Sequence, residues 1–135
     1  MIESTSKILP ALMVASGGAL GSLARFGLRE WLPAITSTDY PFSTLIVNIT
    51  GCFLAGFVYM WLEASGGHWS AEKLLFFFVG FLGAFTTFSA FALDSFLLFH
   101  QGDHLRLMIN ILANCLLSLI CVFVGAWLGG RIAAH

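Results

Sequence analysis

The sequence predicts an all-α membrane protein with four transmembrane helices in one domain that covers residues 1–135. Hydrophobic residues make up 59% of the chain and charged residues only 10%, whereas soluble domains average about 25% charged residues. A helix needs about 20 apolar residues to cross a bilayer, so this chain has room for about four spans. Four apolar runs fit that length: Ile8 to Leu28, Phe42 to Leu62, Leu74 to Phe99, and Leu105 to Gly130.

Short polar connections and tryptophans support the boundaries of these runs. The connections are Glu30 to Pro41, Glu63 to Lys73, and His100 to His104. Tryptophan prefers the membrane–water interface, and every tryptophan lies near a predicted span end: Trp31, Trp61, Trp69 and Trp127. The first run is not expected to be a cleaved signal peptide, because its apolar pattern continues to Leu28 and cleavage would remove half of a span.

The third run contains the segment 83–91, GAFTTFSAF, which places three hydroxyl side chains among three phenylalanines. The β-branched Thr86 and Thr87 follow Gly83 and Ala84, and this combination weakens a helix locally. We therefore expect the third helix to be broken at its centre. Non-helical backbone at membrane depth is tolerated only where it faces protein or a water-filled cavity. The segment is a candidate site for an ion or a solute.

Two other spans carry polar side chains at helical spacing. Thr44 and Asn48 share one face of the second span. A longer stripe follows the fourth span at intervals of four residues: Asn110, Asn114 and Ser118. Polar groups inside a membrane are costly and often mark a pathway. The alternative is that they hold helices together, since one such hydrogen bond contributes about 0.6 kcal/mol on average.

This set of polar groups suits an anion better than a cation. Amide and hydroxyl groups are donors, and Phe88 and Phe91, which share a face, could turn their positive ring edges toward a path; packing in the core is the alternative. Asp94 is the only acidic residue inside a predicted span, whereas a cation pathway would be expected to carry acidic groups or histidine at mid-membrane. Arg25, near the end of the first span, could attract anions or extend to the interface.

The basic residues do not favour either orientation in the membrane. With four spans they divide equally between the two sides: Lys7, Lys73 and Arg131 on one, and Arg25, Arg29 and Arg106 on the other. Because the bias in Lys and Arg sets orientation, this balance predicts insertion in both directions and an antiparallel, dual-topology homodimer. The alternative is that another factor fixes one orientation. Small-residue pairs could allow close helix contact: Gly17 with Gly21, Gly80 with Ala84, and Gly125 with Gly129.

Three motifs together resemble those of one membrane-protein family. The segment 83–91 is similar to the third-helix motif of the Fluc-type fluoride channels, also called the CrcB family. Residues 17–25 resemble the family's first-helix pattern of glycines that ends in arginine, and residues 44–51 resemble its second-helix pattern. The motifs occur in the family's order, and the resemblance covers essentially the whole chain. It implies a passive channel that exports toxic fluoride across the plasma membrane, here a bacterial inner membrane.

The resemblance also implies the arrangement of the site. The family forms an antiparallel dimer with two pores and one structural Na⁺, which the backbone carbonyls of Gly83 and Thr86 would hold at the dimer interface. Ala84 stands where the family often has a second glycine. Arg25 matches an arginine of the aqueous vestibule. The implied fluoride pore contains two phenylalanines and a set of polar side chains: Phe88, Phe91, Asn48, Thr44, Asn110, Asn114 and Ser118.

Other functions fit the sequence less well. A small multidrug-type proton antiporter needs an acidic residue at mid-membrane in its first span, and none lies between Ile8 and Arg25. A structural subunit of a larger complex would need neither the polar stripe nor the helix break. An enzyme is not expected, because no nucleophile–base pair, metal motif or phosphate loop is found. The cysteines at 52, 115 and 121 lack metal-ligand spacing. The expected partners are fluoride, the lipid bilayer and a second copy, and not nucleic acid.

Overall fold

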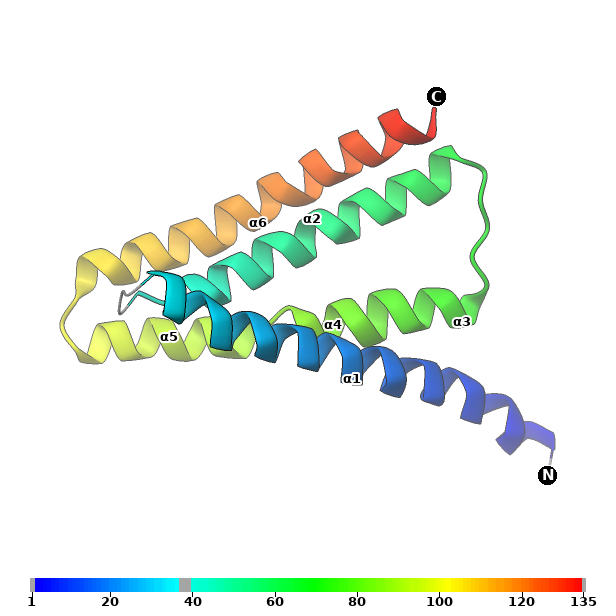
Figure 1. Ribbon diagram of the computed structural model, residues 1–135, viewed down its shortest axis with the longest axis horizontal. Helices are drawn as coiled ribbons and strands as arrows, with labels where there is room; N and C mark the ends of the chain where they lie inside the picture. The colour runs from blue at the N-terminus through cyan, green and yellow to red at the C-terminus, as the bar shows by residue number, and fades with distance from the viewer. Residues whose placement is uncertain (1, 37–39, 135) are drawn as a thin grey trace.

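Four long helical paths make up the computed structural model, which describes the backbone of residues 2–36 and 40–134 (Figure 1). All four are long and apolar enough to cross a membrane, and no strand occurs in these two ranges, which confirms the prediction of an all-helical, multi-pass membrane protein. Three paths are single helices: α1 (Ile2–Thr36), α2 (Phe42–Ala64) and α6 (His104–Ala133). The third path is divided into α3 (Ala71–Leu74), the π-helical η1 (Leu75–Leu82), α4 (Gly83–Phe85) and α5 (Phe88–His100).

Helix α1 is longer than the sequence predicted. It continues through Glu30 to Thr36, so the prediction of a connection that begins at Glu30 was wrong. Leu28, Arg29 and Glu30 are good helix formers, and charge by itself does not end a helix. Arg25 therefore lies well inside α1 and not near its end.

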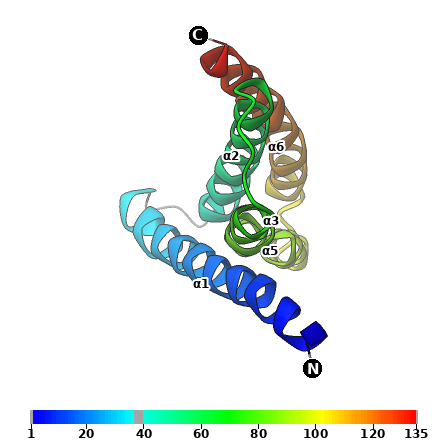
Figure 2. The ribbon, with the colours of Figure 1, turned by 90° about the vertical axis from the view of Figure 1, so that its right-hand side faces the viewer.

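Successive helical paths run in opposite directions, as expected for a chain that crosses a membrane four times (Figure 1). The starts of α1 and α3 and the end of α6 lie at one end of the molecule, whereas the loop between α5 and α6 lies at the other (Figure 1). Helices α2 and α6 pack along their length and run in the same direction, while α1 packs across η1 and α4 (Figure 2). The third path thus lies between α1 and the α2–α6 pair.

Glycines allow the closest of these helix contacts. A Cβ atom on Gly17 or Gly21 of α1 would clash with carbonyl oxygens of η1. A Cβ atom on Gly56 of α2 would clash with the backbone of α6, and one on Gly125 of α6 would clash with the backbone of α2. Small residues at such positions let two backbones touch. The predicted glycine pairs at 17/21 and 125/129 therefore lie in helix contacts within one chain.

Thr86 and Thr87 separate α4 from α5, and both have extended backbone. The hydroxyl of Thr86 donates to the carbonyl of Leu82 at 2.9 Å. The hydroxyl of Thr87 accepts from the N–H of Ala90 at 3.2 Å and caps the start of α5. Side chains thus replace some of the backbone partners that the interruption removes.

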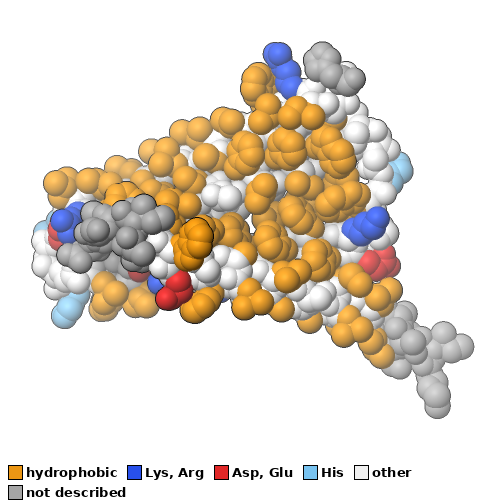
Figure 3. Space-filling model, viewed as in Figure 1, with side chains coloured by type: hydrophobic (Ala, Val, Ile, Leu, Met, Phe, Trp, Pro, Cys, Tyr) orange, Lys and Arg blue, Asp and Glu red, His pale blue; other side chains and the backbone are white. Residues whose placement is uncertain are grey.

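The outside of the molecule is apolar and part of its interior is polar. Hydrophobic side chains cover most of the face in Figure 3, and most charged side chains in that view lie toward the two ends. Thr44, Asn110 and Asn114 are only 1%, 0% and 5% exposed. Lipid surroundings favour this arrangement, because polar groups find partners only inside the protein.

Candidate functional site

An open pocket of about 400 Å³ lies where the interruption between α4 and α5 meets α2 and α6. The structure brings five of the residues predicted for a pathway into its lining: Asn48, Phe88, Phe91, Asn114 and Ser118. The remaining lining residues are Cys52, Thr86, Thr87, Cys115 and Leu119. Thr44 and Asn110 do not line this pocket.

Asn48 joins the interruption to α6. Its side-chain oxygen accepts from the N–H of Thr87 at 2.9 Å. Its amide nitrogen donates to the carbonyl of Thr87 at 3.3 Å and to Oδ1 of Asn114 at 3.0 Å. One side chain of α2 therefore satisfies both backbone groups of a non-helical residue and connects them to the fourth span.

A chain of hydrogen bonds continues from Asn114 into the core. The amide nitrogen of Asn114 donates to Oδ1 of Asn110 at 3.0 Å, and that of Asn110 donates to Oγ of Ser95 at 3.0 Å. Ser95 in turn donates to the carbonyl of Phe91 at 2.8 Å. Asn110 has no exposed surface, so within one chain it supports Asn114 from behind the pocket.

Thr44 is also buried, and its partner is the acidic group of the third path. Its hydroxyl donates to Oδ2 of Asp94 at 2.6 Å. The sequence left Asp94 without a role, because Thr44 and Asp94 are far apart along the chain. The contact joins the first half of α2 to α5 and turns the carboxylate of Asp94 toward α2.

Two aromatic rings and one hydroxyl without a partner among the described residues line the pocket. The ring centroids of Phe88 and Phe91 are 5.4 Å apart, and the rings meet at 65°. Both rings line the pocket; Phe91 is 9% exposed and Phe88 is 77% exposed. The hydroxyl oxygen of Ser118 is buried and has no hydrogen-bond partner among the described residues. Such a group is costly to leave unpaired.

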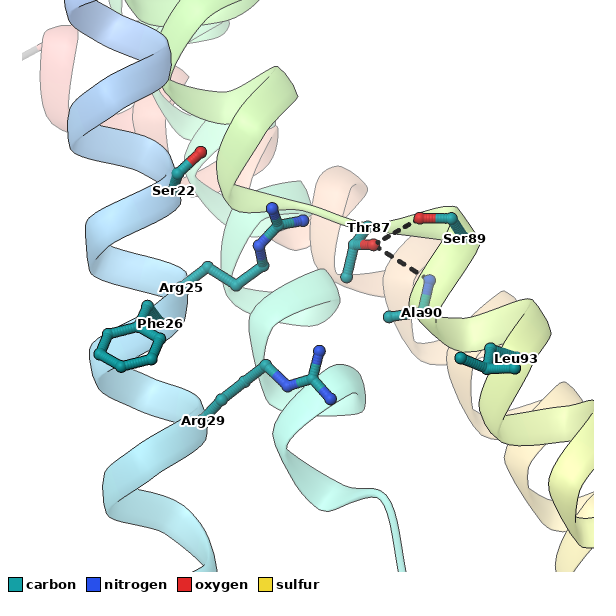
Figure 4. A pocket seen from close by; sticks show the side chains of 8 residues that line it. All are labelled: Ser22, Arg25, Phe26, Arg29, Thr87, Ser89, Ala90 and Leu93. Carbon is teal, nitrogen blue, oxygen red and sulfur yellow. Dashed lines mark hydrogen bonds between the residues drawn. The ribbon is translucent and has the colours of Figure 1, made fainter.

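A second open pocket, of about 450 Å³, lies between α1 and the start of α5. Arg25 and Arg29 reach into it from α1, and Thr87 and Ser89 face them from the other side (Figure 4). Thr87 lines both pockets. The sequence singled out Arg25 but missed Arg29 and Ser89, although the spacing of the two arginines by four residues was a visible signal.

The backbone carbonyl oxygens of Gly83 and Thr86, the two predicted sodium ligands, lack their helical donors. In a continuous α-helix, Gly83 O would accept from the N–H of Thr87, and Thr86 O from the N–H of Ala90. Here the first N–H donates to a side chain of α2 and the second to the Thr87 hydroxyl. Thr86 O has only a long contact of 3.5 Å from Nη1 of Arg25, and a carbonyl oxygen has two lone pairs.

Four apolar helical paths, three of which line an open pocket of amide, hydroxyl and aromatic groups, define a small multi-pass membrane protein with a polar site. Residues 12–126 match the family model described as CrcB-like protein, Camphor Resistance (CrcB). The chain belongs to the CrcB family, as the three sequence motifs indicated.

Curated relatives of high similarity carry the name "Fluoride-specific ion channel FluC". The chain is 46% identical over 121 residues to such a protein from Dehalococcoides mccartyi, with 90% of this chain and 92% of the relative covered. It is 46% identical over 120 residues to one from Legionella pneumophila, with 87% of each covered. It is 39% identical over 125 residues to one from Parabacteroides distasonis, with 93% and 96% covered. These names confirm the prediction of a channel family as opposed to an enzyme.

Proposed function

We propose that the chain forms a passive, fluoride-selective channel that lets fluoride leave a bacterial cell across its plasma membrane. The observation that carries this proposal is the pocket in which Phe88, Phe91 and the free hydroxyl of Ser118 meet at the helix interruption. The relatives named as fluoride channels supply the identity of the ion.

The chemistry of this pocket suits a small, strongly hydrated anion. Fluoride must exchange its water for other donors when it enters a narrow path, and fixed positive charges would hold it too tightly to leave. Aromatic edges and a hydroxyl are weaker donors, and conduction requires binding that permits both entry and exit. Asn48, Asn114 and Ser118 line the path, Asn110 supports Asn114 from behind it, and Thr44 holds the carboxylate of Asp94.

The proposed assembly is an antiparallel, dual-topology homodimer with two pores. The pocket is open in the single chain, and the ring of Phe88 is 77% exposed, so a second copy would enclose each path. The equal division of Lys and Arg between the two sides supports insertion in both orientations. Cysteine labelling of a Ser4→Cys variant from outside intact cells tests this point. Labelling of about half of the protein is expected, and complete labelling or none would contradict dual topology.

The residues at the interruption fit a structural sodium ion. Gly83 O and Thr86 O lack helical donors, and carbonyl oxygen is a hard ligand of the kind that Na⁺ accepts. In the proposed site the second copy would supply the same two carbonyls and complete the coordination. A bound Na⁺ would offset the partial negative charge of carbonyls that no N–H group satisfies.

Fluoride efflux from liposomes tests the proposed function directly. Purified protein is reconstituted with internal potassium fluoride, and a fluoride electrode follows release after valinomycin allows potassium to leave. We expect rapid efflux only after valinomycin is added, and retention of chloride under the same conditions. No efflux from protein shown to be inserted would refute the channel, and efflux that needs a proton gradient would favour an antiporter.

A further inference from the structure

Two of the cysteines line the pocket at the helix interruption. Cys52 reaches it from α2 and Cys115 from α6, and both have free thiols. Cys121, further along α6, is also a free thiol but does not line this pocket. Cys52 and Cys115 are far apart along the chain, so their spacing in the sequence could not show that they share one site. The proposed fluoride path assigns no role to either thiol.

The hydrogen bond between Asn48 and Asn114 sets the relative height of the two thiols. Asn48 donates to Asn114 at 3.0 Å, and α2 and α6 run in the same direction (Figure 1). Cys52 follows Asn48 by one helical turn on the same face, and Cys115 is the residue after Asn114. The two cysteines are therefore offset along the helix axes by about 4.5 Å. A linear metal ion with bonds of about 2.3 Å, the length of a Zn–S bond, holds two sulfurs about 4.6 Å apart.

The other groups of the pocket restrict the kind of metal that fits. Among the described residues, no group of three or more His, Cys, Asp or Glu side chains could hold an ion, so a four-coordinate ion such as Zn²⁺ lacks ligands here. Thiolates select soft ions such as Cu(I). The side-chain amides of Asn48 and Asn114 are bonded to protein oxygens. The buried Ser118 hydroxyl, which has no partner among the described residues, is at most a weak third ligand in the same pocket.

We infer that Cys52 and Cys115 form a binding site for one soft monovalent metal ion of the Cu(I) and Ag(I) class, and that this ion blocks the fluoride path. At each thiol a sulfur–metal bond replaces the sulfur–hydrogen bond and the proton goes to water, so the step needs no oxidant or reductant. Two thiolates and one monovalent cation carry one net negative charge. This charge lies in the pocket of Phe88 and Phe91 and repels a second anion. The block rests on the proposed function, whereas the metal site does not.

Silver binding measures the site without any need for transport. Purified protein in micelles is titrated with silver nitrate in a chloride-free buffer that contains a monothiol competitor, and native mass spectrometry reports the metal bound per chain. A single protein thiol competes poorly with the free monothiol, whereas two sulfurs that hold one ion act at a high effective concentration. We expect the unmodified protein to bind one silver ion per chain, and Cys52→Ala and Cys115→Ala each to bind it at least about tenfold more weakly.

Cys121→Ala is the matched control, because it removes a thiol of α6 that lies outside the pocket. It should keep the silver affinity of the unmodified protein. Unchanged affinity in Cys115→Ala, or an equal loss of affinity in Cys121→Ala, would overturn the inference. Cys115 is exposed, so its substitution should leave the fold intact, and this comparison decides the question even if Cys52→Ala does not fold.

Fluoride efflux then separates this inference from the proposed function. At a silver concentration that fills the site in the presence of the competitor, efflux from the unmodified protein and from Cys121→Ala should fall at least about tenfold, because like charges repel strongly at close range. Efflux from Cys115→Ala should be nearly unchanged. Absence of efflux from the unmodified protein without silver would refute the channel, whereas the silver titration would still decide the metal site. Full efflux from protein whose site is filled would overturn the block.

Discussion

The hydrogen bond between Asn48 and Asn114 should contribute measurably to stability, and a double-mutant cycle can isolate it. The contact is 3.0 Å long, and Asn114 is only 5% exposed. Side-chain hydrogen bonds between membrane helices contribute about 0.6 kcal/mol on average and up to about 1.7 kcal/mol. Because this bond is short and buried, we expect a coupling free energy of about 1–1.5 kcal/mol between Asn48→Ala and Asn114→Ala.

The single substitutions should differ in cost. Asn48→Ala removes the acceptor of the Thr87 N–H, and Thr87 is itself only 7% exposed. A buried donor left without a partner costs about 1–3 kcal/mol. With the other lost hydrogen bonds, the total should be about 2–4 kcal/mol. Asn114→Ala leaves the Thr87 N–H paired and should cost about 1–2 kcal/mol.

Equilibrium unfolding in mixed micelles, followed by tryptophan fluorescence, measures these free energies. Protein concentration must be constant across the variants, because an oligomer makes apparent stability depend on it. Ser16→Ala is a suitable control, since the Ser16 hydroxyl is exposed and bonds only to its own helix backbone; it should change stability by less than about 0.5 kcal/mol. A coupling below about 0.3 kcal/mol, or an Asn48→Ala cost no larger than that of Ser16→Ala, would refute this reasoning.

Three further outcomes are expected. Phe88→Ile should slow fluoride efflux about threefold to tenfold, because the ring edge is lost. The control Phe123→Ile, on an exposed part of α6 outside the pocket, should leave the efflux rate unchanged. Equal rates in the unmodified protein and both variants would contradict the aromatic path. Gly56→Ala should destabilise the fold by about 1–3 kcal/mol, because its Cβ would clash with the backbone of α6. Gly27→Ala, whose Cβ meets open space, should stabilise the fold by up to about 1 kcal/mol. Similar unfolding free energies for Gly56→Ala and Gly27→Ala would contradict the close contact between α2 and α6. Burial raises the pKa of the Tyr40 hydroxyl. The stability that this shift contributes is fully present below the pKa of about 10 that tyrosine has in the unfolded chain, and it is lost as the pH rises through the pKa of the folded protein. Tyr40→Phe should therefore lose less stability than the unmodified protein as the pH rises above about 10. Parallel pH profiles of the two proteins would show that this hydroxyl is not responsible.

The sequence predicted the four helices well, because lipid imposes a simple length and composition on a span. It predicted the region of the site for a similar reason, since amides and hydroxyls are rare enough in apolar runs to be noticed. It did not predict which partners these groups choose. Thr44 and Asn48 share a face of α2, yet one bonds Asp94 and the other bonds Thr87 and Asn114.

Those choices depend on how the third path lies between α1 and the α2–α6 pair, which no local pattern encodes. The same limit applies to the stripe on the fourth span. Spacing places Asn110, Asn114 and Ser118 on one face, but only the last two line the pocket. The length of α1 was also missed, because its polar end continues as a helix. Because the sequence ended this helix too early, it did not show that Arg25 lies well inside α1 or that Arg29 lies in the same pocket.

The hydrogen bonds around the interruption are consistent with the proposed site, which would have to be rigid and still hold an anion weakly. The N–H and the carbonyl of Thr87 both form hydrogen bonds with the Asn48 side chain, and the Thr87 hydroxyl caps the start of α5. The side-chain amide nitrogens of Asn48 and Asn114 likewise donate hydrogen bonds to protein oxygens. The strongest donors are therefore committed to the structure, and in the proposed channel the Ser118 hydroxyl and the two aromatic rings would remain for the ion. A path built in this way keeps its shape when an ion passes, because no structural hydrogen bond has to break. It would also bind the ion through weak contacts, which is the condition for rapid passage through several sites.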